Sequence, residues 1–479
     1  MASTPGASLW KDPYESVNLP EDKNPVNFSN VKKARVVAAG VAIIVNSALG
    51  SSLPSGAASD IAKEFSVTAP LQLVLLNSIY MLGFAIGPLI FGPLSEHVGR
   101  RIVLIGTYVA YMVFTLCCAV GPTYGTLLLF RLLCGIAAAA PNAVVGPLFA
   151  DIYDRPERRG RLMAYFMCAT SMTPPFGPII SGYATRVSWR LTFWIGLAIA
   201  GVCLPLVVFL PETYVPVLKK KYARKNGDEI SLELPCPEKK KYQLLQELGT
   251  IFSRPFVMIT REPVVLFSSP CSTLYLFFQA YPIIFRGVYG LSYGEVGLAF
   301  LPVTAGSVLA LVIFLCYSAY HSSAMKAGAP WTAKIEYRRL PLACAGGPVI
   351  VISLFWLGWT AYPNIHPAVP AVSGLFFGTG YPVIFMALLN YITDAYRQFS
   401  ASVQASASTL RSITAVCLPL AAPQMYDKLG VQWACSLLAF ITLVLALIPF
   451  VFIRYGEALR KRSPFCQKLA QPPSMILAT

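Results

Sequence analysis

The sequence Gly92-Pro93-Leu94-Ser95-Glu96-His97-Val98-Gly99-Arg100-Arg101 lies between two apolar runs that are each long enough to cross a membrane. A carboxylate and paired arginines are costly in hydrocarbon, so this stretch must form a turn at a membrane surface. Gly92 allows another helix to approach closely, and Gly99 permits a sharp reversal of the chain. The turn therefore separates two membrane-spanning helices and fixes the topology around it.

The composition agrees with a helical membrane protein. The mean hydropathy is +0.59, and 56% of the 479 residues are hydrophobic while only 13% are charged, which excludes an ordinary soluble domain. At about 20 residues per span, the pattern predicts an all-α polytopic fold of twelve transmembrane helices. They are expected to begin near Val36, Leu73, Ile102, Tyr124, Leu162, Leu191, Pro263, Gly294, Leu340, Ala368, Ser402 and Gln432.

The basic residues predict the orientation of these spans. Of the 38 Lys and Arg, 31 fall on the cytoplasmic side if the N-terminus is cytoplasmic. This sorting also explains the net charge of +16 without a nucleic-acid partner. We expect both termini in the cytoplasm, with a tail 1–35, a six-helix half 36–210, a central loop 211–262, a pseudo-symmetric half 263–455 and a tail 456–479. The first tail has few apolar residues and is expected to be disordered or bound to the surface.

The charges of the opening stretch suggest a latch that a moving helix bundle makes and breaks. Glu96 can accept hydrogen bonds from Arg100 or from a helix N-terminus, and Asp151 follows the fourth span at the same membrane face. Asp394 follows the tenth span in an equivalent position, as an internal repeat of a transporter would require. A plain positively charged turn and solvated loop charges are the alternatives. The latch candidates are Gly92, Glu96, Gly99, Arg100, Arg101, Asp151 and Asp394.

Polar side chains inside the spans are the candidate binding groups. Arg131 lies within the fourth span and Arg411 near the middle of the eleventh, where a charge must meet an acid, a cavity or a substrate. Snorkelling to the external surface is the alternative for Arg131, and packing or lipid contact is the alternative for the aromatic groups. The substrate-binding candidates are Asn46, Asn77, Asn142, Tyr275, Phe278, Gln279, Gln404 and Arg411.

The fifth span contains Pro174-Pro175-Phe176-Gly177-Pro178-Ile179-Ile180-Ser181-Gly182. Prolines interrupt the backbone hydrogen bonds of a helix, and glycines allow close contact, so Gly177, Pro178 and Gly182 are hinge candidates. A static structural kink is the alternative.

These motifs resemble those of the major facilitator superfamily. Gly92, Glu96, Gly99, Arg100 and Arg101 match its loop signature, in which Asp is commoner than Glu and a base usually stands where this chain has His97. Arg131 with Gly135 resembles a motif of the superfamily's antiporters, and the Gly177 to Gly182 segment, with Ser181 in place of a glycine, resembles one of its drug:proton antiporters. The run from Tyr391 through Ala439 resembles the fungal drug:proton antiporter branch. The resemblance implies proton coupling, for which Arg131 and Asp151 are the candidates.

Other functions lack their motifs. The sequence contains no phosphate-binding loop of an ATP-driven pump, and His97, His321 and His366 are too far apart to predict a metal site. We therefore expect no enzyme activity, metal or cofactor. The expected function is alternating-access export of small amphipathic organic molecules in exchange for protons. We expect it to be performed by a monomer in the lipid bilayer of the plasma membrane. An uptake facilitator or symporter and a non-transporting receptor or scaffold are the alternatives.

Overall fold

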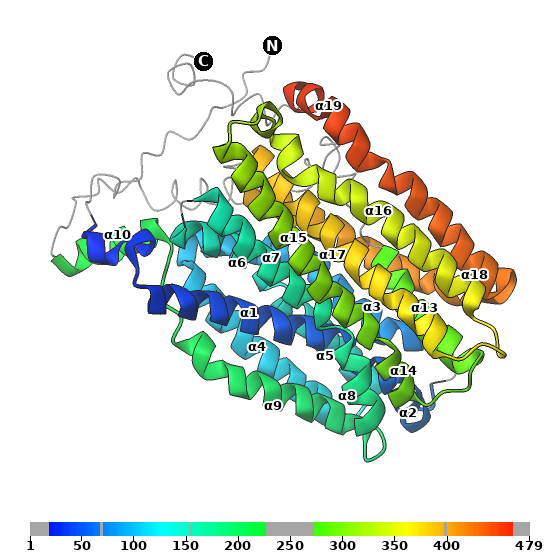
Figure 1. Cartoon of the computed structure of the whole chain (residues 1–479). Helices are drawn as coiled ribbons and strands as arrows, with labels where there is room; N and C mark the ends of the chain where they lie inside the picture. Colours follow the sequence, from blue (N-terminus) through cyan, green and yellow to red (C-terminus); the bar gives the residue numbers. More distant parts are fainter. Residues whose placement is uncertain (1–18, 68–69, 154, 227–272, 397–399, 463–479) are drawn as a thin grey trace, which may run out of the picture.

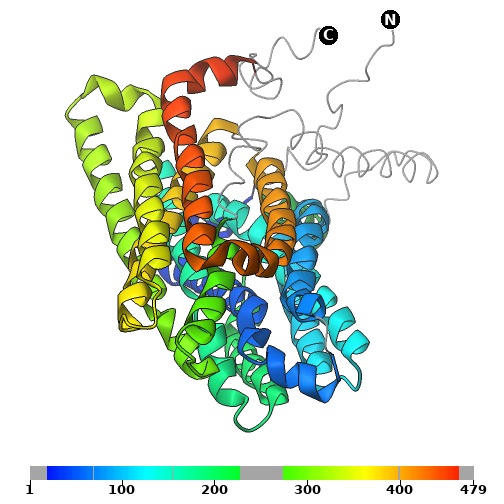
Figure 2. The same cartoon turned by 90° about the vertical axis from the view of Figure 1, so that its right-hand side faces the viewer.

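The computed structural model describes residues 19–67, 70–153, 155–226, 273–396 and 400–462. These residues form helices and connecting turns, and no strand occurs among them. Figure 1 shows the helices of the first half, coloured blue to green, gathered beside those of the second half, coloured green to red. The view turned by 90° in Figure 2 shows the same two groups side by side.

The first half runs from α1 to α9. Its long helices are α1 (Asn30–Ser52), α3 (Pro70–Val98), α4 (Arg100–Val120) and α9 (Trp189–Val208). Two further crossings are each made of two consecutive helices, α5 (Tyr124–Ala138) with α6 (Ala140–Ile152), and α7 (Pro156–Met172) with α8 (Phe176–Ala184). The shorter elements are η3 (Leu53–Gly56) and α2 (Ala58–Glu64), and the helix α10 (Val215–Asn226) follows the half.

The second half runs from α13 to α19. It contains α13 (Thr273–Gly287), α14 (Tyr293–Ala299), α15 (Leu301–Lys326), η5 (Pro330–Ala333), α16 (Ile335–Thr360), α17 (Ala368–Tyr396), α18 (Ser400–Ala446) and α19 (Ile448–Arg462). Gly430 lies inside α18 with a φ of 70°, so the chain reverses there between the eleventh and twelfth predicted spans.

Nine of the predicted spans are long and apolar enough to cross a membrane within the described ranges. The fifth, seventh and eleventh predicted spans do not meet the same measure there. They correspond in order to the pair α7 and α8, to α13, and to the first part of α18. The all-helical membrane fold is confirmed, and the succession of helices is consistent with twelve crossings.

Local sequence explains where several helices begin and end. Gly99 adopts a φ of 106°, which an L side chain rarely tolerates, and this single residue separates α3 from α4. The side chain of Thr123 accepts a hydrogen bond from the backbone of Thr126 and so caps α5. The helix of the fifth crossing is interrupted at Thr173-Pro174-Pro175, just before the predicted hinge residues.

The segment before α1 is ordered against the first half. Glu21–Lys23 and Pro25–Asn27 form two 3-10 turns, Pro25 is buried, and the Lys33 ammonium donates a 2.6 Å hydrogen bond to the Val26 carbonyl. The Lys23 ammonium also lies 4.5 Å from the centre of the Tyr222 ring in α10. The expectation of disorder is therefore wrong for this part of the tail, because local turns and packing on α10 offset its shortage of apolar residues. The helix α1 itself begins at Asn30, before the predicted boundary at residue 36.

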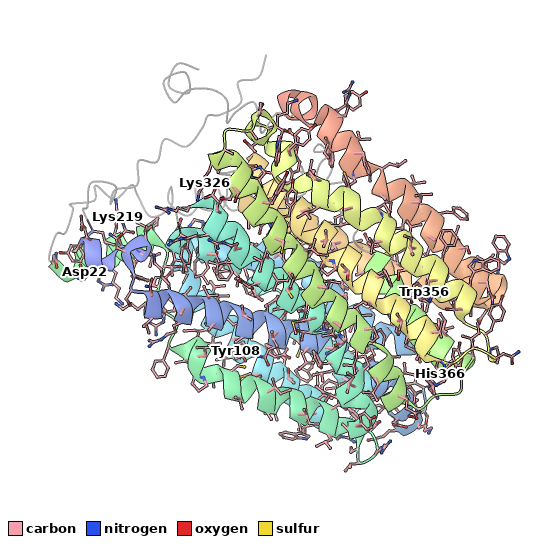
Figure 3. All side chains as sticks on the ribbon, in the orientation of Figure 1. Asp22, Tyr108, Lys219, Lys326, Trp356 and His366 are labelled. Carbon is pink, nitrogen blue, oxygen red and sulfur yellow. The ribbon has the colours of Figure 1, made fainter. Side chains whose placement is uncertain are left out.

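The two ends of the bundle are distinguished here by the helices that they carry. Figure 3 shows Asp22, Lys219 and Lys326 toward the end that carries α10, and His366 toward the opposite end, where α2 and α14 lie. They are called the α10 end and the α2 end below. The second view in Figure 2 agrees that the helices run between these two ends.

Candidate functional site

A charge cluster at the α10 end contains part of the predicted latch. The Arg100 Nε atom donates a 2.6 Å hydrogen bond to Oδ2 of Asp151, and the side chains are 6% and 18% exposed, respectively. Oδ2 of Asp151 also accepts a hydrogen bond from Thr213, at 3.2 Å. The Arg100 guanidinium lies 5.0 Å from the Tyr214 ring centre, which closes another side of the ion pair. This is a largely dehydrated pair with several partners.

Glu212 occupies the position that the sequence suggested for Glu96. Its carboxylate accepts hydrogen bonds from the backbone N–H groups of Arg100 and Arg101, at 3.1 and 3.2 Å, and so caps the N-terminus of α4. Glu96 is exposed and forms no ion pair with any residue that the structure describes. Glu212 was not predicted, because this residue follows α9 and lies far from the motif in the sequence. Arg100, Asp151 and Glu212 are called the framework cluster below.

The other latch candidates lie close to this cluster or outside the described side chains. Gly92 packs against α6, where an added Cβ would lie 3.6 Å from that of Ala143. Gly99 faces Glu212, and Arg101 donates to the Val208 carbonyl at 3.4 Å. Asp394 lies in the last part of α17, but its side chain is outside the described residues.

Arg131 is buried and bound to the backbone. Its side chain is 2% exposed, and it donates to the carbonyls of Gly50 and Ser51 at 2.7 and 3.4 Å and to that of Leu76 at 3.4 Å. The guanidinium also stacks 4.4 Å from the ring centre of Tyr80. Arg131 therefore ties α5 to the last turn of α1 and to α3, and it does not snorkel outward.

Asn46 and Asn77 border this same region. The Tyr111 hydroxyl donates to the Asn46 carbonyl at 3.1 Å, and Tyr80 donates to the carbonyl of the adjacent Ser47 at 2.8 Å. The side-chain Oδ1 atoms of Asn46 and Asn77 are buried and have no hydrogen-bond partner among the described residues. Unpaired buried amide oxygens are costly, so they are suited to receive a donor from a substrate or a water molecule. Asn142 lies in α6 and is half-buried.

Gln404 and Arg411 both lie in α18 of the second half, but they differ in what they contact. Gln404 is buried against the first half, because an added Cβ at Gly146 would lie 2.9 Å from its Oε1 atom. Thr409, on the same helix, donates to the Ala85 carbonyl of α3 at 3.0 Å. Arg411 is half-buried within its own half, with its guanidinium 4.7 Å from the Phe385 ring centre. Tyr275, Phe278 and Gln279 lie in α13, but their side chains are outside the described residues.

The predicted hinge residues form a close contact at the α2 end. A Cβ added to Gly182 would lie 2.7 Å from the backbone of Tyr293 and Gly294 in α14, and one added to Gly297 would lie 2.8 Å from Ile179. Pro178 belongs to the same contact. Gly177 packs against Ser52 of the first half. Gly182 and Gly297 therefore allow the backbones of α8 and α14 to contact each other directly.

A second contact between the halves lies at the α10 end. Arg338 of α16 donates a 2.9 Å hydrogen bond to Glu157 of α7, and their side chains are 25% and 38% exposed. Next to it, the Arg339 guanidinium lies directly against Gly160 of α7. Neither Glu157 nor Arg338 was singled out from the sequence. Glu157 and Arg338 are called the bridging pair below.

Comparison with known proteins identifies the fold family. The family model of the Major Facilitator Superfamily matches residues 39–416. The chain belongs to the major facilitator superfamily. It is a membrane transporter and not an enzyme.

Within the superfamily, the chain is similar to several fungal proteins over most of its length. It is 34% identical to the MFS-type transporter traF of Penicillium crustosum, across 95% of this chain and 92% of that one. It is also 34% identical to the efflux pump FUBT of Fusarium oxysporum, across 97% of this chain and 80% of that one. The major facilitator superfamily multidrug transporter mdrA of Aspergillus fumigatus is also 34% identical, across 97% of this chain and 77% of that one.

Solved structures of the superfamily share the fold. The proton:xylose symporter XylE bound to 6-bromo-6-deoxy-D-glucose superposes with a TM-score of 0.63 and 14% identity, covering 89% of this chain and 97% of that one. A partially occluded inward-open conformation of the xylose transporter XylE from E. coli superposes with a TM-score of 0.62 and 15% identity, covering 89% of this chain and 98% of that one. At this identity the similarity concerns the arrangement of helices alone.

Proposed function

We propose that this transporter exports small amphipathic organic molecules by alternating access, in exchange for protons. The observation that supports export is the similarity, over 95% or more of the chain, to fungal transporters that include an efflux pump and a multidrug transporter. In this proposal the α10 end faces the cytoplasm and the membrane is the plasma membrane. The protein acts as a monomer, with both termini cytoplasmic.

The contacts between the halves supply the parts that alternating access requires. The α8 to α14 contact closes the α2 end, and the bridging pair joins the halves at the α10 end. Transport requires these contacts to break in turn while each half stays intact. Gly177, Pro178 and Gly182 then serve as the hinge beside the interrupted helix of the fifth crossing.

In this proposal the candidate binding groups line the interface between the halves. Asn46 and Asn77 offer buried amide oxygens from the first half, and Gln404 lies against Gly146 from the second. In this proposal Asn142, Tyr275, Phe278, Gln279 and Arg411 complete a lining of aromatic and amide groups, which suits an amphipathic organic molecule. Arg131 acts by holding the last turn of α1, and Asp151 is the second candidate for proton coupling.

The test is accumulation of substrate by proteoliposomes that have an acidic lumen. The panel contains cationic, neutral and carboxylate-bearing aromatic compounds, and protein-free liposomes with the same gradient report passive partitioning. An exchanger in either orientation accumulates its substrate as protons leave, whereas a symporter expels it and a facilitator equilibrates it. Accumulation above the protein-free control supports the proposal, and equilibration alone or expulsion would overturn proton exchange.

Arg131→Ala is the matched variant for this assay, with Arg131→Lys beside it. Loss of the guanidinium removes the hydrogen bonds to Gly50 and Ser51. We therefore expect the initial rate of accumulation to fall about tenfold or more, which corresponds to ~1.4 kcal/mol in the rate-limiting barrier. Lysine retains the charge without the planar set of donors and should restore only part of the rate. Elution as a single peak in size-exclusion chromatography checks that both variants fold.

A further inference from the structure

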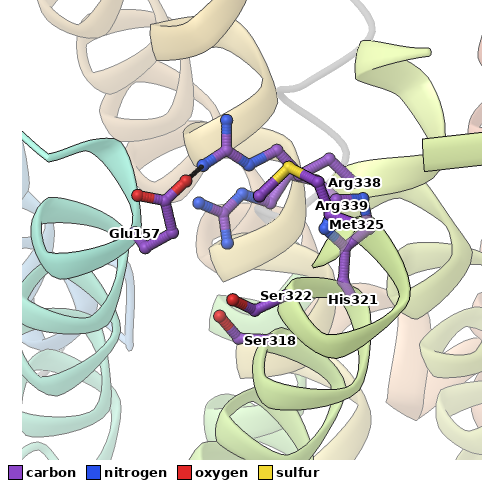
Figure 4. A pocket seen from close by; sticks show the side chains of 7 residues that line it. All are labelled: Glu157, Ser318, His321, Ser322, Met325, Arg338 and Arg339. Atoms are coloured by element: carbon purple, nitrogen blue, oxygen red, sulfur yellow. Dashed lines mark hydrogen bonds and ion pairs between the residues drawn. The ribbon is translucent and has the colours of Figure 1, made fainter. Parts of the chain in front are cut away.

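A polar pocket lies between the halves at the α10 end. Figure 4 shows its lining, to which α7 contributes Glu157, α15 contributes Ser318, His321, Ser322 and Met325, and α16 contributes Arg338 and Arg339. Its cavity volume is about 10 Å³, which is room for about one water molecule, and it opens to solvent. None of these residues belongs to the predicted binding set, which lies along other helices.

The pocket contains a buried polar group that lacks a partner. His321 is 6% exposed, and its Nε2 atom makes no hydrogen bond to any residue that the structure describes. Its ring packs edge-on against Trp331 of η5, with 5.4 Å between the ring centres. The imidazole therefore packs on an aromatic neighbour, and its buried Nε2 atom is an unpaired polar group beside the pocket.

The charges around the pocket favour an anion. Among the described lining residues, Arg338 and Arg339 carry guanidinium groups and Glu157 carries the one carboxylate, which is bound to Arg338 and can be exchanged for another anion. Figure 4 shows the Ser318 and Ser322 hydroxyls on the same side of the pocket as these charged groups. Guanidinium, imidazole and hydroxyl groups together match the several acceptors of an oxyanion.

We propose that this pocket binds the oxyanion of a ligand that arrives at the α10 end, namely a carboxylate or a phosphate. The oxyanion takes the place of the Glu157 carboxylate on Arg338 and is also held by His321 and the two serines. Glu157 and Arg338 are partly exposed, so a ligand in solution reaches them. Because Glu157 belongs to the first half and Arg338 to the second, this exchange releases a contact between the halves.

This inference deepens the proposed function, on which it rests, because it adds amphipathic carboxylates to the exported substrates. The aromatic rings beside the pocket support that class. Tyr320 stacks on Trp331 with 6.0 Å between ring centres, and Tyr320 is 63% exposed. An aromatic acid can place its carboxylate on the cationic groups and its ring near this surface.

The test is equilibrium binding of 2-naphthoate and its neutral isostere 2-naphthamide to the full chain in phosphatidylcholine nanodiscs. We expect naphthoate to bind about tenfold more tightly than naphthamide, since only the acid forms charge-assisted hydrogen bonds. Binding requires no transport, so failure here leaves export standing. A failed flux assay likewise leaves the binding result readable.

Four variants separate this site from other basic groups. We expect Arg338→Gln and His321→Gln to abolish most of the preference for the acid, and Ser322→Ala to weaken it about threefold. Glu157→Gln removes the competing carboxylate and should tighten naphthoate binding. Lys326→Gln is the control, because Lys326 lies at the same end of α15, is exposed and does not line the pocket. A thermal melt of each variant checks that it folds.

A lipid phosphate is the other source of an oxyanion. Naphthoate binding is therefore repeated in nanodiscs that contain anionic phosphatidylglycerol. Weaker naphthoate binding to the wild type in these nanodiscs, with unchanged binding of naphthamide, would support the same pocket with a lipid occupant, and unchanged naphthoate binding would support a soluble carboxylate. Equal affinity for the acid and the amide in both lipids, or weaker naphthoate binding in Glu157→Gln, would overturn the proposal.

Discussion

The framework cluster and the bridging pair lie at the same end of the molecule, yet they differ in what they join. The Arg100 and Asp151 side chains are 6% and 18% exposed and belong to one half, with Glu212 and Thr213 completing their hydrogen bonds. Glu157 and Arg338 are 38% and 25% exposed and belong to different halves. A dehydrated pair with many partners is costly to break, whereas a partly hydrated pair exchanges readily with water.

This difference separates structural support from conformational change. The framework cluster holds α4, α6 and the segment after α9 together, so it moves with the first half as a unit. In the proposed mechanism, the bridging pair is a charged contact between the halves that breaks when the α10 end opens. We therefore propose that the signature at Gly92 to Arg101 maintains the first half and that the bridging pair is the contact that changes; the predicted latch stays a prediction.

The largest expected effect comes from Asp151→Ala, which leaves the buried Arg100 guanidinium without its carboxylate. Loss of one partner from a buried pair costs about 3–5 kcal/mol, so we expect little folded protein and no transport. Detergent extraction with size-exclusion chromatography measures the folded fraction. Arg101→Ala is the control, because Arg101 is exposed and we expect a normal yield of folded protein. A yield of folded Asp151→Ala equal to that of Arg101→Ala would show that the cluster is dispensable.

Gly182→Val tests the contact between the halves that contains no charge. The new side chain would overlap the backbone of Tyr293 and Gly294, and overpacking of this kind costs about 1–3 kcal/mol. We expect the α2 end to be held open, with faster labelling of a cysteine introduced at Tyr293. Gly201→Val is the control, because open space surrounds Gly201. Equal labelling in both variants would mean that α8 and α14 need no backbone contact.

Glu157→Gln should change stability by less than about 1 kcal/mol, because the bridging pair is partly exposed. The same change should open the α10 end more often, which a labelling rate at that end measures. The exchanged pair Glu157→Arg with Arg338→Glu restores the attraction and should return the rate toward that of the wild type. A large fall in melting temperature for Glu157→Gln would place this pair with the framework cluster.

The smallest effect concerns the acid dependence of a partly exposed cluster at the α2 end. Hydrogen bonds from Trp189 and Arg190 lower the pKa of Glu64 below its usual value of 4.5. The ionised carboxylate therefore adds stability above about pH 4.5, and this stability is lost as the pH falls through the lower pKa of the folded state. Melting curves should show a slightly weaker dependence on pH in this window for Glu64→Gln than for the wild type. An identical dependence would contradict the assigned partners.

The sequence predicts the fold well because the membrane limits the possible structures. Apolar run length gives most spans, and the Gly99 reversal follows from a turn that had to leave the membrane. The pairing of Arg100 with Asp151 could also be predicted, because both residues follow spans that end at the same membrane face.

Contacts that depend on distant packing were not predictable in this way. Glu212 reaches the N-terminus of α4 only through the path of α9, and Arg338 meets Glu157 only once the two halves are placed together. The carbonyl groups and the tyrosine ring that contact Arg131 could not be identified from the sequence either, and its contact with a substrate stays a prediction. Carbonyl groups are present at every residue, so no sequence pattern distinguishes those that will accept from an arginine.

The most direct test of the account is to prevent the bridging pair from separating. Glu157 and Arg338 are both replaced by cysteine and joined with a short bismaleimide in proteoliposomes, with each single replacement treated in the same way as a control. We expect the linked protein to stop accumulating a neutral or cationic substrate of the panel, which does not need the Arg338 guanidinium, while both treated single variants continue to accumulate it. Continued accumulation by the fully linked protein would show that the halves need not part at the α10 end, and would contradict alternating access through this contact.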